Sequence, residues 1–492
     1  MKKYNVLTIW ALMAMLFVTF SCTDDFVDRK AEYSIDSENY FNSEDDYYNA
    51  LIAVYDILQS TYVNVLLGEI ASDNTLCGGE SATDVIGFQQ VDDMTHTPIN
   101  DNLTNVWDWN FAGVNRANYI LEFKDKTEFE GKEQIIAETR FLRAYFYFEL
   151  VKWFGALPLK DDARFAINDE KSIPRSPVEE VYAYIEADLQ YAVENLSVTA
   201  PQVGRASKGA AQALLGKVYL YQEKFSESAA VLEDLISSSN YALVNDFSTL
   251  FEEEQENGIE SVFEVQYTDI EGAGFGCLQC SEGNVAVGFM GIRNYEGPMF
   301  SSGFSFNLPT PDAYAAFDDD DMRRDYTVLD VEAWAAETGA TYGTGYEHTG
   351  YFNRKYLPRK RSADAQSDLN LTNPNNYRAI RYADVLLMAA EAYNRGGIND
   401  TKAQEYLNEV RARAYGDTNH NITVSGNALT DYIWEERRLE LMGEGHRFFD
   451  LVRTGRAAQN IPGFTAGKNE VFPVPFEEIQ FSNGNWEQNP NY

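Results

Sequence analysis

Cysteine and histidine are scarce in this chain of 492 residues, which has four of each. A zinc site needs four such ligands close together. Cys277 and Cys280 form a C-x-x-C pair, but the scattered histidines supply no second pair of ligands. A redox motif would be expected between a strand and a helix, whereas this pair lies among glycines. The sequence therefore indicates a structural disulfide here, or none.

Basic residues are also few. Lysine and arginine number 39 against 77 acidic residues, which gives a net charge of −38. Such a charge argues against nucleic acid or an anionic membrane surface as a partner. It fits a highly soluble protein with a neutral or cationic ligand, although a saline habitat would produce the same composition. Aromatic residues make up 14% of the chain, enough for a large core and for a binding surface besides.

The apolar run at residues 6–20 is too short for a comfortable membrane span. Two lysines precede it and Ser21-Cys22 follows, which is typical of a signal peptide over residues 1–21. A cysteine after a small residue resembles a bacterial lipobox, so we expect lipidation of Cys22 and a tether over residues 22–40; simple cleavage nearby is the alternative. In an exported chain the three remaining cysteines would give one disulfide and one free thiol.

Residues 137–158 form the longest aromatic-rich helical pattern, and the rest of the chain is organised around it. Its apolar residues fall on two faces, Phe141, Tyr145 and Phe148 on one and Leu142, Phe146, Leu150 and Trp153 on the other. A helix that is apolar on two faces is buried between neighbours. Gly155 and Pro158 should end it. Arg140 is placed to pair with Glu138, and Lys152 with Glu149.

Other segments supply helical partners for this central helix. Ser43 and Asp46 form a capping box that opens one helix, and Ser176 followed by Pro177 opens another. Residues 204–219 and 225–237 look like one tetratricopeptide unit, and residues 381–393 and 403–414 like a second. Residues 261–267 alternate as a strand does.

The chain becomes rich in loops over about residues 240–375. Thirteen of the 33 glycines lie between Gly258 and Gly350, together with many aromatics. A loop-rich interval this long is usually functional or disordered, and the aromatics argue against disorder. A run of aspartates inside it, Asp318, Asp319, Asp320 and Asp321, could hold a structural calcium ion; a solvated turn is the favoured alternative.

Several segments resemble one known family. They are residues 141–159, the Gly-Arg-Ala-Ser-Lys element at 204–208, residues 381–393, the E-R-R-x-E-L pattern within 433–455, and residues 488–492. They are similar to the SusD/RagB family of outer-membrane glycan-binding lipoproteins. The resemblance implies a mainly α fold over residues 41–492, a right-handed tetratricopeptide-like superhelix with about four helix pairs, long ligand-binding loops and a few short strands. It also implies a surface-exposed protein that passes oligo- or polysaccharide to a SusC-like TonB-dependent transporter.

Within that family the loops opposite the transporter should bind the glycan. Sugar rings stack on aromatic side chains, and their hydroxyls need polar partners. We expect the platform to comprise Asp73, Asn74, Phe289, Arg293, Tyr295, Trp334, Tyr342 and Tyr346. Trp334 is the strongest candidate because it adjoins a loop rich in glycine and tyrosine. The alternative is that it lies on a short amphipathic helix, residues 331–338, and packs inward.

Two other functions remain open from the residues. A surface glycoside hydrolase would need two carboxylates about 5–9.5 Å apart across a cleft, and with 77 acidic residues such pairs carry no weight alone. A helical-repeat scaffold that binds proteins would use the tetratricopeptide-like units. We expect no catalytic residues, no required metal and no cofactor other than the possible calcium. Glu435, Glu436, Asp450 and His446 are interpreted as structural, since arginine and glutamate at helical spacing pair with one another.

Overall fold

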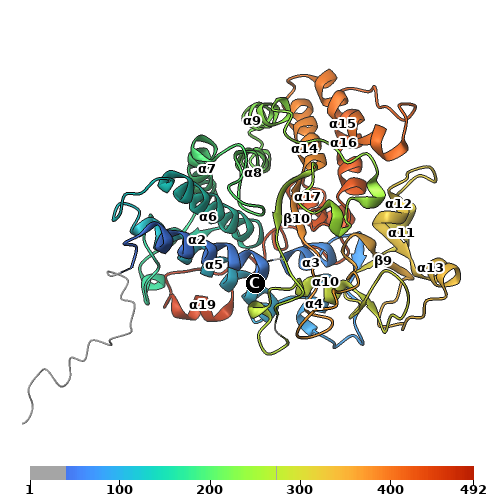
Figure 1. The fold of residues 1–492 in the computed structure, drawn as a ribbon, viewed down its shortest axis with the longest axis horizontal. Helices are drawn as coiled ribbons and strands as arrows, with labels where there is room; N and C mark the ends of the chain where they lie inside the picture. The colour runs from blue at the N-terminus through green and yellow to red at the C-terminus, as the bar shows by residue number, and fades with distance from the viewer. Residues whose placement is uncertain (1–39, 62, 273) are drawn as a thin grey trace, which may run out of the picture.

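The structure is a computed structural model that describes residues 40–492, apart from residues 62 and 273. The signal peptide, Cys22 and nearly all of the tether lie outside the described residues. Helices dominate the described part, and its strands form five two-stranded pairs (Figure 1). The mainly α fold class is therefore confirmed.

Long helices form a stack along one side of the molecule and into its upper part (Figure 1). Their bounds are α2 (Glu44–Thr61), α5 (Asp101–Glu122), α6 (Lys132–Phe154), α7 (Val178–Asn195), α8 (Lys208–Tyr221), α9 (Phe225–Ser237), α14 (Tyr382–Arg395), α15 (Asp400–Tyr415) and α16 (Asn427–Glu440). Helix α2 packs on α5, α6 on α7, α8 on α9, and α14 on α15, while α5–α6, α7–α8 and α9–α14 contacts join these pairs. A single helix pair cannot bury its apolar face, and stacking against neighbouring pairs buries it, as in tetratricopeptide arrays.

Helix α6 is the centre of this stack, as its two apolar faces predict. Phe141, Phe146 and Trp153 are fully buried. The helix begins at Lys132, earlier than the aromatic pattern, and ends before Gly155, whose φ of 71° is in the left-handed region that glycine adopts readily.

The charges of α6 pair partly as predicted. Lys152 Nζ lies 2.7 Å from Glu149. The predicted pair between Arg140 and Glu138 is wrong, because both side chains reach other elements. Arg140 bonds Asp188 of α7 at 2.7 Å, and Glu138 bonds Arg205 at 2.6 Å. Side chains two residues apart on a helix do not face each other, so Arg140 pairs with α7 and Glu138 with the loop before α8.

The predicted helix starts differ in accuracy. Ser43 and Asp46 form the reciprocal capping box before α2, with N–O distances of 3.3 and 3.1 Å. Helix α7 begins at Val178, so Pro177 and not Ser176 occupies the cap position. The predicted strand is β4 (Ser261–Val265), which pairs antiparallel with β10 (Tyr377–Arg381).

Short elements and loops build the other side of the molecule. The helices there are α3 (Val63–Ile70), α4 (Ile86–Asp92), α10 (Val285–Met290), α11 (Pro311–Ala315), α12 (Arg324–Thr327) and α13 (Val331–Thr338), and the strands are β1 (Thr75–Leu76), β5 (Ile292–Arg293), β6 (Ser302–Gly303), β7 (Leu308–Pro309), β8 (Val328–Asp330) and β9 (Tyr351–Asn353). A second, smaller core holds this side together; it includes Tyr295, Phe300 and Phe352.

Near the end of the chain, α17 (Arg447–Arg453), α18 (Ala457–Asn460) and α19 (Phe476–Phe481) follow α16. Elsewhere, two further strands, β2 (Leu157–Pro158) and β3 (Arg175–Ser176), pair beside α6.

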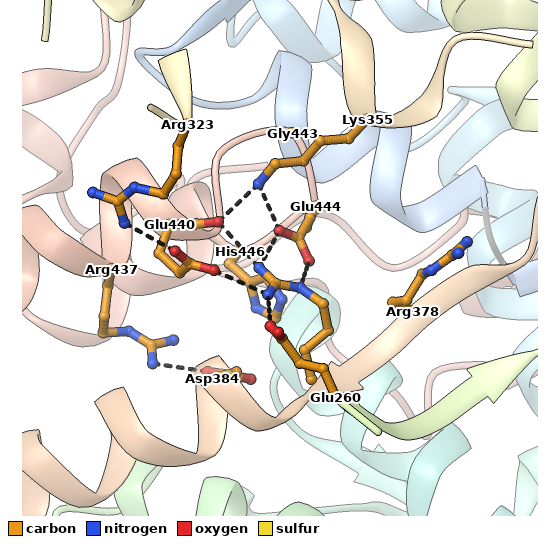
Figure 2. A network of polar contacts seen from close by, with 12 residues as sticks. Glu260, Arg323, Lys355, Arg378, Asp384, Arg437, Glu440, Gly443, Glu444 and His446 are labelled. Atoms are coloured by element: carbon orange, nitrogen blue, oxygen red, sulfur yellow. Dashed lines mark hydrogen bonds and ion pairs between the residues drawn. The ribbon is translucent and has the colours of Figure 1, made fainter. Parts of the chain in front are cut away.

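A buried network of ion pairs, centred on α16 and the turn after it, joins the two sides of the molecule (Figure 2). Glu440 accepts from Arg381, Arg413 and Arg323 at 2.7–3.0 Å. The Arg and Glu side chains of this motif are structural, as expected, but most of their partners come from distant segments.

Candidate functional site

Three loops meet at one surface on the loop-rich side, and we call residues 78–85, 292–306 and 342–348 the loop cluster. Backbone hydrogen bonds join them: Gly79 N to Ser305 O at 2.9 Å, Tyr346 N to Gly79 O at 2.9 Å, and Gly343 N to Arg293 O at 2.8 Å. Segments more than 200 residues apart in the sequence thus form one rigid surface. Loops on a rigid scaffold are the usual carriers of binding residues.

Gly345 is needed for this close approach. A Cβ at this position would lie 2.2 Å from Gly79 O and 3.4 Å from Arg293 Nε. Any other residue would therefore push the 342–348 loop away from the other two loops.

Polar groups of the loop cluster surround Arg293, which is half-buried. Its Nη2 donates to Phe304 O at 2.9 Å and lies 3.6 Å from the Asp84 carboxylate. Its buried Nε has no partner among the described residues. The guanidinium and the Asp84 carboxylate supply the donor and acceptor groups that sugar hydroxyls require.

Aromatic rings border these polar groups. Phe275 is 62% exposed and its ring lies 5.8 Å from that of Phe304. Tyr342 and His348 are half-buried, with rings 5.8 Å apart, and Tyr346 follows in the same loop. The chain near Phe275 is closed by a disulfide between Cys277 and Cys280, so the first of the two alternatives for this pair is confirmed.

A half-buried carboxylate, that of Asp92, supports the start of the first loop. Cys77, just before it, donates its backbone N–H to Asp92 at 2.9 Å. The pKa of Asp92 is raised to about 7, chiefly by burial and in smaller part by the neighbouring Asp93, although the bond from Cys77 lowers it. Burial also raises the pKa of the Cys77 thiol, and Asp92 adds to the shift, so this free cysteine is an unreactive core residue.

Trp334 is not a surface platform. It lies on α13, whose bounds are those of the amphipathic alternative, and is half-buried against the smaller core. Its Nε1 donates to Tyr295 Oη at 2.9 Å, and that hydroxyl donates to Pro298 O at 2.8 Å. The ring also packs 5.6 Å from Phe300. The indole therefore packs inward, and Tyr295 is buried as well.

Three more predicted site residues belong to the scaffold. Phe289 is buried. Asn74 has no exposed surface and accepts a bond from Arg438 at 2.9 Å. Asp73 makes two 2.7 Å bonds to Arg447. The acidic segment after α3 therefore fastens the loop-rich side to the C-terminal helices and offers no free group to a ligand.

The structure thus brings together Arg293, Tyr342 and Tyr346 of the predicted set. Sequence reasoning missed Asp84, Phe275, Phe304 and His348. Phe275 had a usable signal, since it lies two residues before the C-x-x-C pair in a glycine-rich loop. Asp84 had none, because its relation to Arg293 depends on the fold.

The four aspartates considered for calcium point to four different partners. Asp318 accepts from Tyr415 and Asp319 from Arg324, while Asp320 lies beside His420 and Asp321 binds Arg323. In the part of the chain that the structure describes, no group of three or more His, Cys, Asp or Glu residues converges on one point. The solvated-turn alternative describes Asp318, Asp319 and Asp320, which are exposed, whereas Asp321 is buried in the ionic network.

Known proteins resemble this chain over nearly its whole length. The sequence model described as "SusD family" matches residues 285–492, and the one described as "Starch-binding associating with outer membrane" matches residues 25–220. A solved structure of a laminarin binding SusD-like protein is 35% identical, covers 92% of this chain and 100% of its own, and superposes with a TM-score of 0.84. The chain belongs to the SusD family.

Two further members of the SusD family show the breadth of the match. SusD-like protein P2 of Formosa agariphila is 27% identical over 525 residues and is covered, like this chain, over 100% of its length. Surface glycan-binding protein A of Bacteroides thetaiotaomicron, solved in complex with laminarihexaose, is 27% identical with a TM-score of 0.81, covering 91% of this chain and 100% of its own. The family resemblance drawn from the sequence is confirmed, and the tetratricopeptide-like fold with it.

Proposed function

We propose that this protein is a cell-surface lipoprotein that captures an oligo- or polysaccharide on the loop cluster and delivers it to a SusC-like TonB-dependent transporter in the outer membrane. The observation that carries the proposal is the 35% identity, over 92% of the chain, to a protein named for binding laminarin. A second relative was solved with laminarihexaose. Laminarin is therefore the first glycan to test.

The loop cluster, together with Phe275 beside its Phe304, has the chemistry that a sugar chain needs. Exposed Phe275 and the rings of Tyr342 and Tyr346 offer apolar faces, while Arg293 and Asp84 offer hydrogen-bonding groups at the same surface. Aromatic faces give binding energy and a few fixed polar groups give orientation. Because backbone bonds between the loops hold these groups in place, little ordering is required on binding.

The test is a calorimetric titration of residues 40–492 with laminarihexaose, laminarin and starch. We expect Tyr346→Ala to lower the affinity for the bound glycan by at least ~1.4 kcal/mol, about tenfold. The melting temperature should hardly move, because Tyr346 supports no core.

Tyr432→Ala is the matched control, since this tyrosine is 45% exposed on α16 and away from the loop cluster (Figure 1). Equal losses in both variants would place the glycan elsewhere. No binding of any polysaccharide in a broad panel would remove the capture function.

The anchor and the delivery step need their own experiments. Cys22→Ala should move the protein from the membrane fraction to the soluble fraction; retention of the variant would exclude a lipid anchor at this position. Co-purification of the intact lipoprotein with a SusC-like barrel from outer membranes would support delivery. A glycan that becomes shorter when incubated with the protein would support the hydrolase alternative.

A further inference from the structure

A cavity of about 350 Å³ lies between α5, the 3-10 turn Asp169–Lys171 and α19. None of the residues that line this cavity belongs to the loop cluster, and α19 lies on the opposite side of the molecule from α13 (Figure 1). The cavity is therefore separate from the loop cluster. Its volume is within the range of pockets that hold small molecules.

Aromatic rings line this α5–α19 pocket. The Trp107 ring lies 4.7 Å from Phe111 and 6.0 Å from Trp486, and Phe111 lies 6.0 Å from Phe165. Trp107 and Trp486 are nearly fully buried, while Phe111 and Phe165 are half-buried. The walls are therefore fixed and largely apolar.

Carboxylates also line the pocket, and they lack cations. Asp108, Glu170 and Glu478 border it, and Glu477 is the neighbour of Glu478 on α19. Within residues 40–492 as described, none of these four carboxylates has an ion-pair partner. Asp169 of the same pocket is paired with Lys160. Glu170 and Glu478 are half-buried, whereas Asp108 at the rim and the adjoining Glu477 are exposed, so the pocket and its rim carry negative charge that no described ion pair offsets.

The carboxylates of this group lie close enough to shift one another's pKa values. The pKa of Glu478 is raised to about 7, chiefly by burial and then by the charges of Asp108, Glu170 and Glu477, against a smaller lowering by a hydrogen bond with Trp107. Burial and Glu477 also raise the pKa of Asp108. A cation placed among these carboxylates would relieve the repulsion.

We propose that the α5–α19 pocket binds an organic cation, an ammonium or guanidinium group on an apolar body. The apolar body fits between the rings, whose faces attract a cation, and the charged head meets the carboxylates. An anion would be repelled by the carboxylates, and a neutral ligand would leave their charge uncompensated. Free amines and the lysine or arginine side chains of a partner protein carry the same group.

The test compares two probes of equal shape, benzylammonium and benzyl alcohol, by tryptophan fluorescence and NMR titration at pH 8. We expect benzylammonium to bind at least tenfold more tightly than benzyl alcohol. Glu478→Gln, which keeps the shape and removes one charge, should weaken benzylammonium binding at least fivefold. Glu194→Gln makes the same change at an exposed position on α7 and should leave the affinity unchanged.

A third probe, the capped tripeptide Gly-Lys-Gly, distinguishes a free amine from a lysine side chain of a partner protein as the ligand. Binding of both cations would identify the pocket as a receptor for a side chain of a partner, and binding of benzylammonium alone as a receptor for free amines. Equal binding of benzylammonium and benzyl alcohol, or an unchanged affinity in a folded Glu478→Gln protein, would overturn the proposal. Laminarin binding by this variant should stay as in the unaltered protein, so the result is independent of the glycan function.

Discussion

Trp334 shows why the environment of a single side chain is hard to predict from sequence. An eight-residue helix with one tryptophan has an apolar face, but the sequence does not say which loops cover that face. Here Phe300 and Tyr295 cover it. The glycine-rich loop beside Trp334 extends into residues 342–348, which belong to the loop cluster that we propose as the glycan site.

Trp334 should therefore matter for stability. Trp334→Ala removes a half-buried ring and should cost about 2 kcal/mol of unfolding free energy, less than for a fully buried tryptophan. Tyr295→Phe keeps the ring but removes the hydroxyl between Trp334 and Pro298 and should cost about 1 kcal/mol. Urea unfolding measures both. An unchanged stability of Trp334→Ala, together with lost glycan binding, would return Trp334 to the site.

Glu478 gives a pH-dependent prediction. Its pKa of about 7 in the folded protein lies above the unfolded value of 4.5, so its ionisation disfavours folding. This penalty is absent below pH 4.5, grows as pH rises, and is complete above pH 7. Glu478→Gln should therefore stabilise the protein at pH 8, by roughly 1 kcal/mol after a discount for solvent screening, and not at pH 5. A gain of equal size at both pH values would show that the carboxylate does not titrate as described.

At the scale of elements, the periodicity of apolar residues predicted the helices in which that periodicity is strong. Helix α6 and the α8–α9 and α14–α15 pairs follow from the spacing of apolar residues, because such a face must be buried wherever the helix lies. Charged partners were less predictable. Glu138 and Arg140 are two residues apart and therefore point to different sides of α6, and each pairs with a segment, at Arg205 and Asp188, that only the fold brings close.

The buried ionic network around α16 leads to a prediction about the stability of this helix. Glu440 lies among Arg381, Arg413 and Arg323, and Glu440→Gln leaves these cations without a charge they need. Removing one member of a buried ionic group costs about 3–5 kcal/mol. Glu435→Gln makes the same change on the same helix at an exposed position with a single partner at 3.4 Å and should cost less than about 0.5 kcal/mol.

The same network sets an acid limit. Burial raises the pKa of Glu440, but Arg413 and Arg381 outweigh it and hold this pKa well below its usual range. The stabilisation from this group is thus complete above the unfolded pKa of 4.5 and is lost as pH falls further. The difference in stability between the unaltered protein and Glu440→Gln should shrink below pH 4.5. A constant difference down to pH 2 would contradict this assignment.

At the scale of the whole molecule, the site depends on segments that the sequence keeps apart. The family resemblance and the glycine-rich interval predicted the region in which we propose the site, and Arg293, Tyr342 and Tyr346 lie together there. Asp84 was not, because its meeting with Arg293 requires α4, α10 and the loops to fold together. Asp73 and Asn74 were predicted to bind the ligand because their actual partners, Arg447 and Arg438, could not be foreseen. These arginines lie more than 360 residues further along the chain.

The net charge of −38 also acts on the whole molecule. Like charges repel most in the compact folded state, and salt screens this repulsion when the Debye length falls from about 30 Å at 0.01 M to about 3 Å at 1 M. The ion pairs around Glu440 are buried, so salt weakens them much less. We therefore expect the melting temperature to rise by a few degrees between 0.01 M and 1 M NaCl at pH 8. Near pH 4.5, where many exposed carboxylates are protonated, the rise should be smaller. A melting temperature that falls with salt at pH 8 would mean that exposed ion pairs outweigh the repulsion of the excess acidic charge.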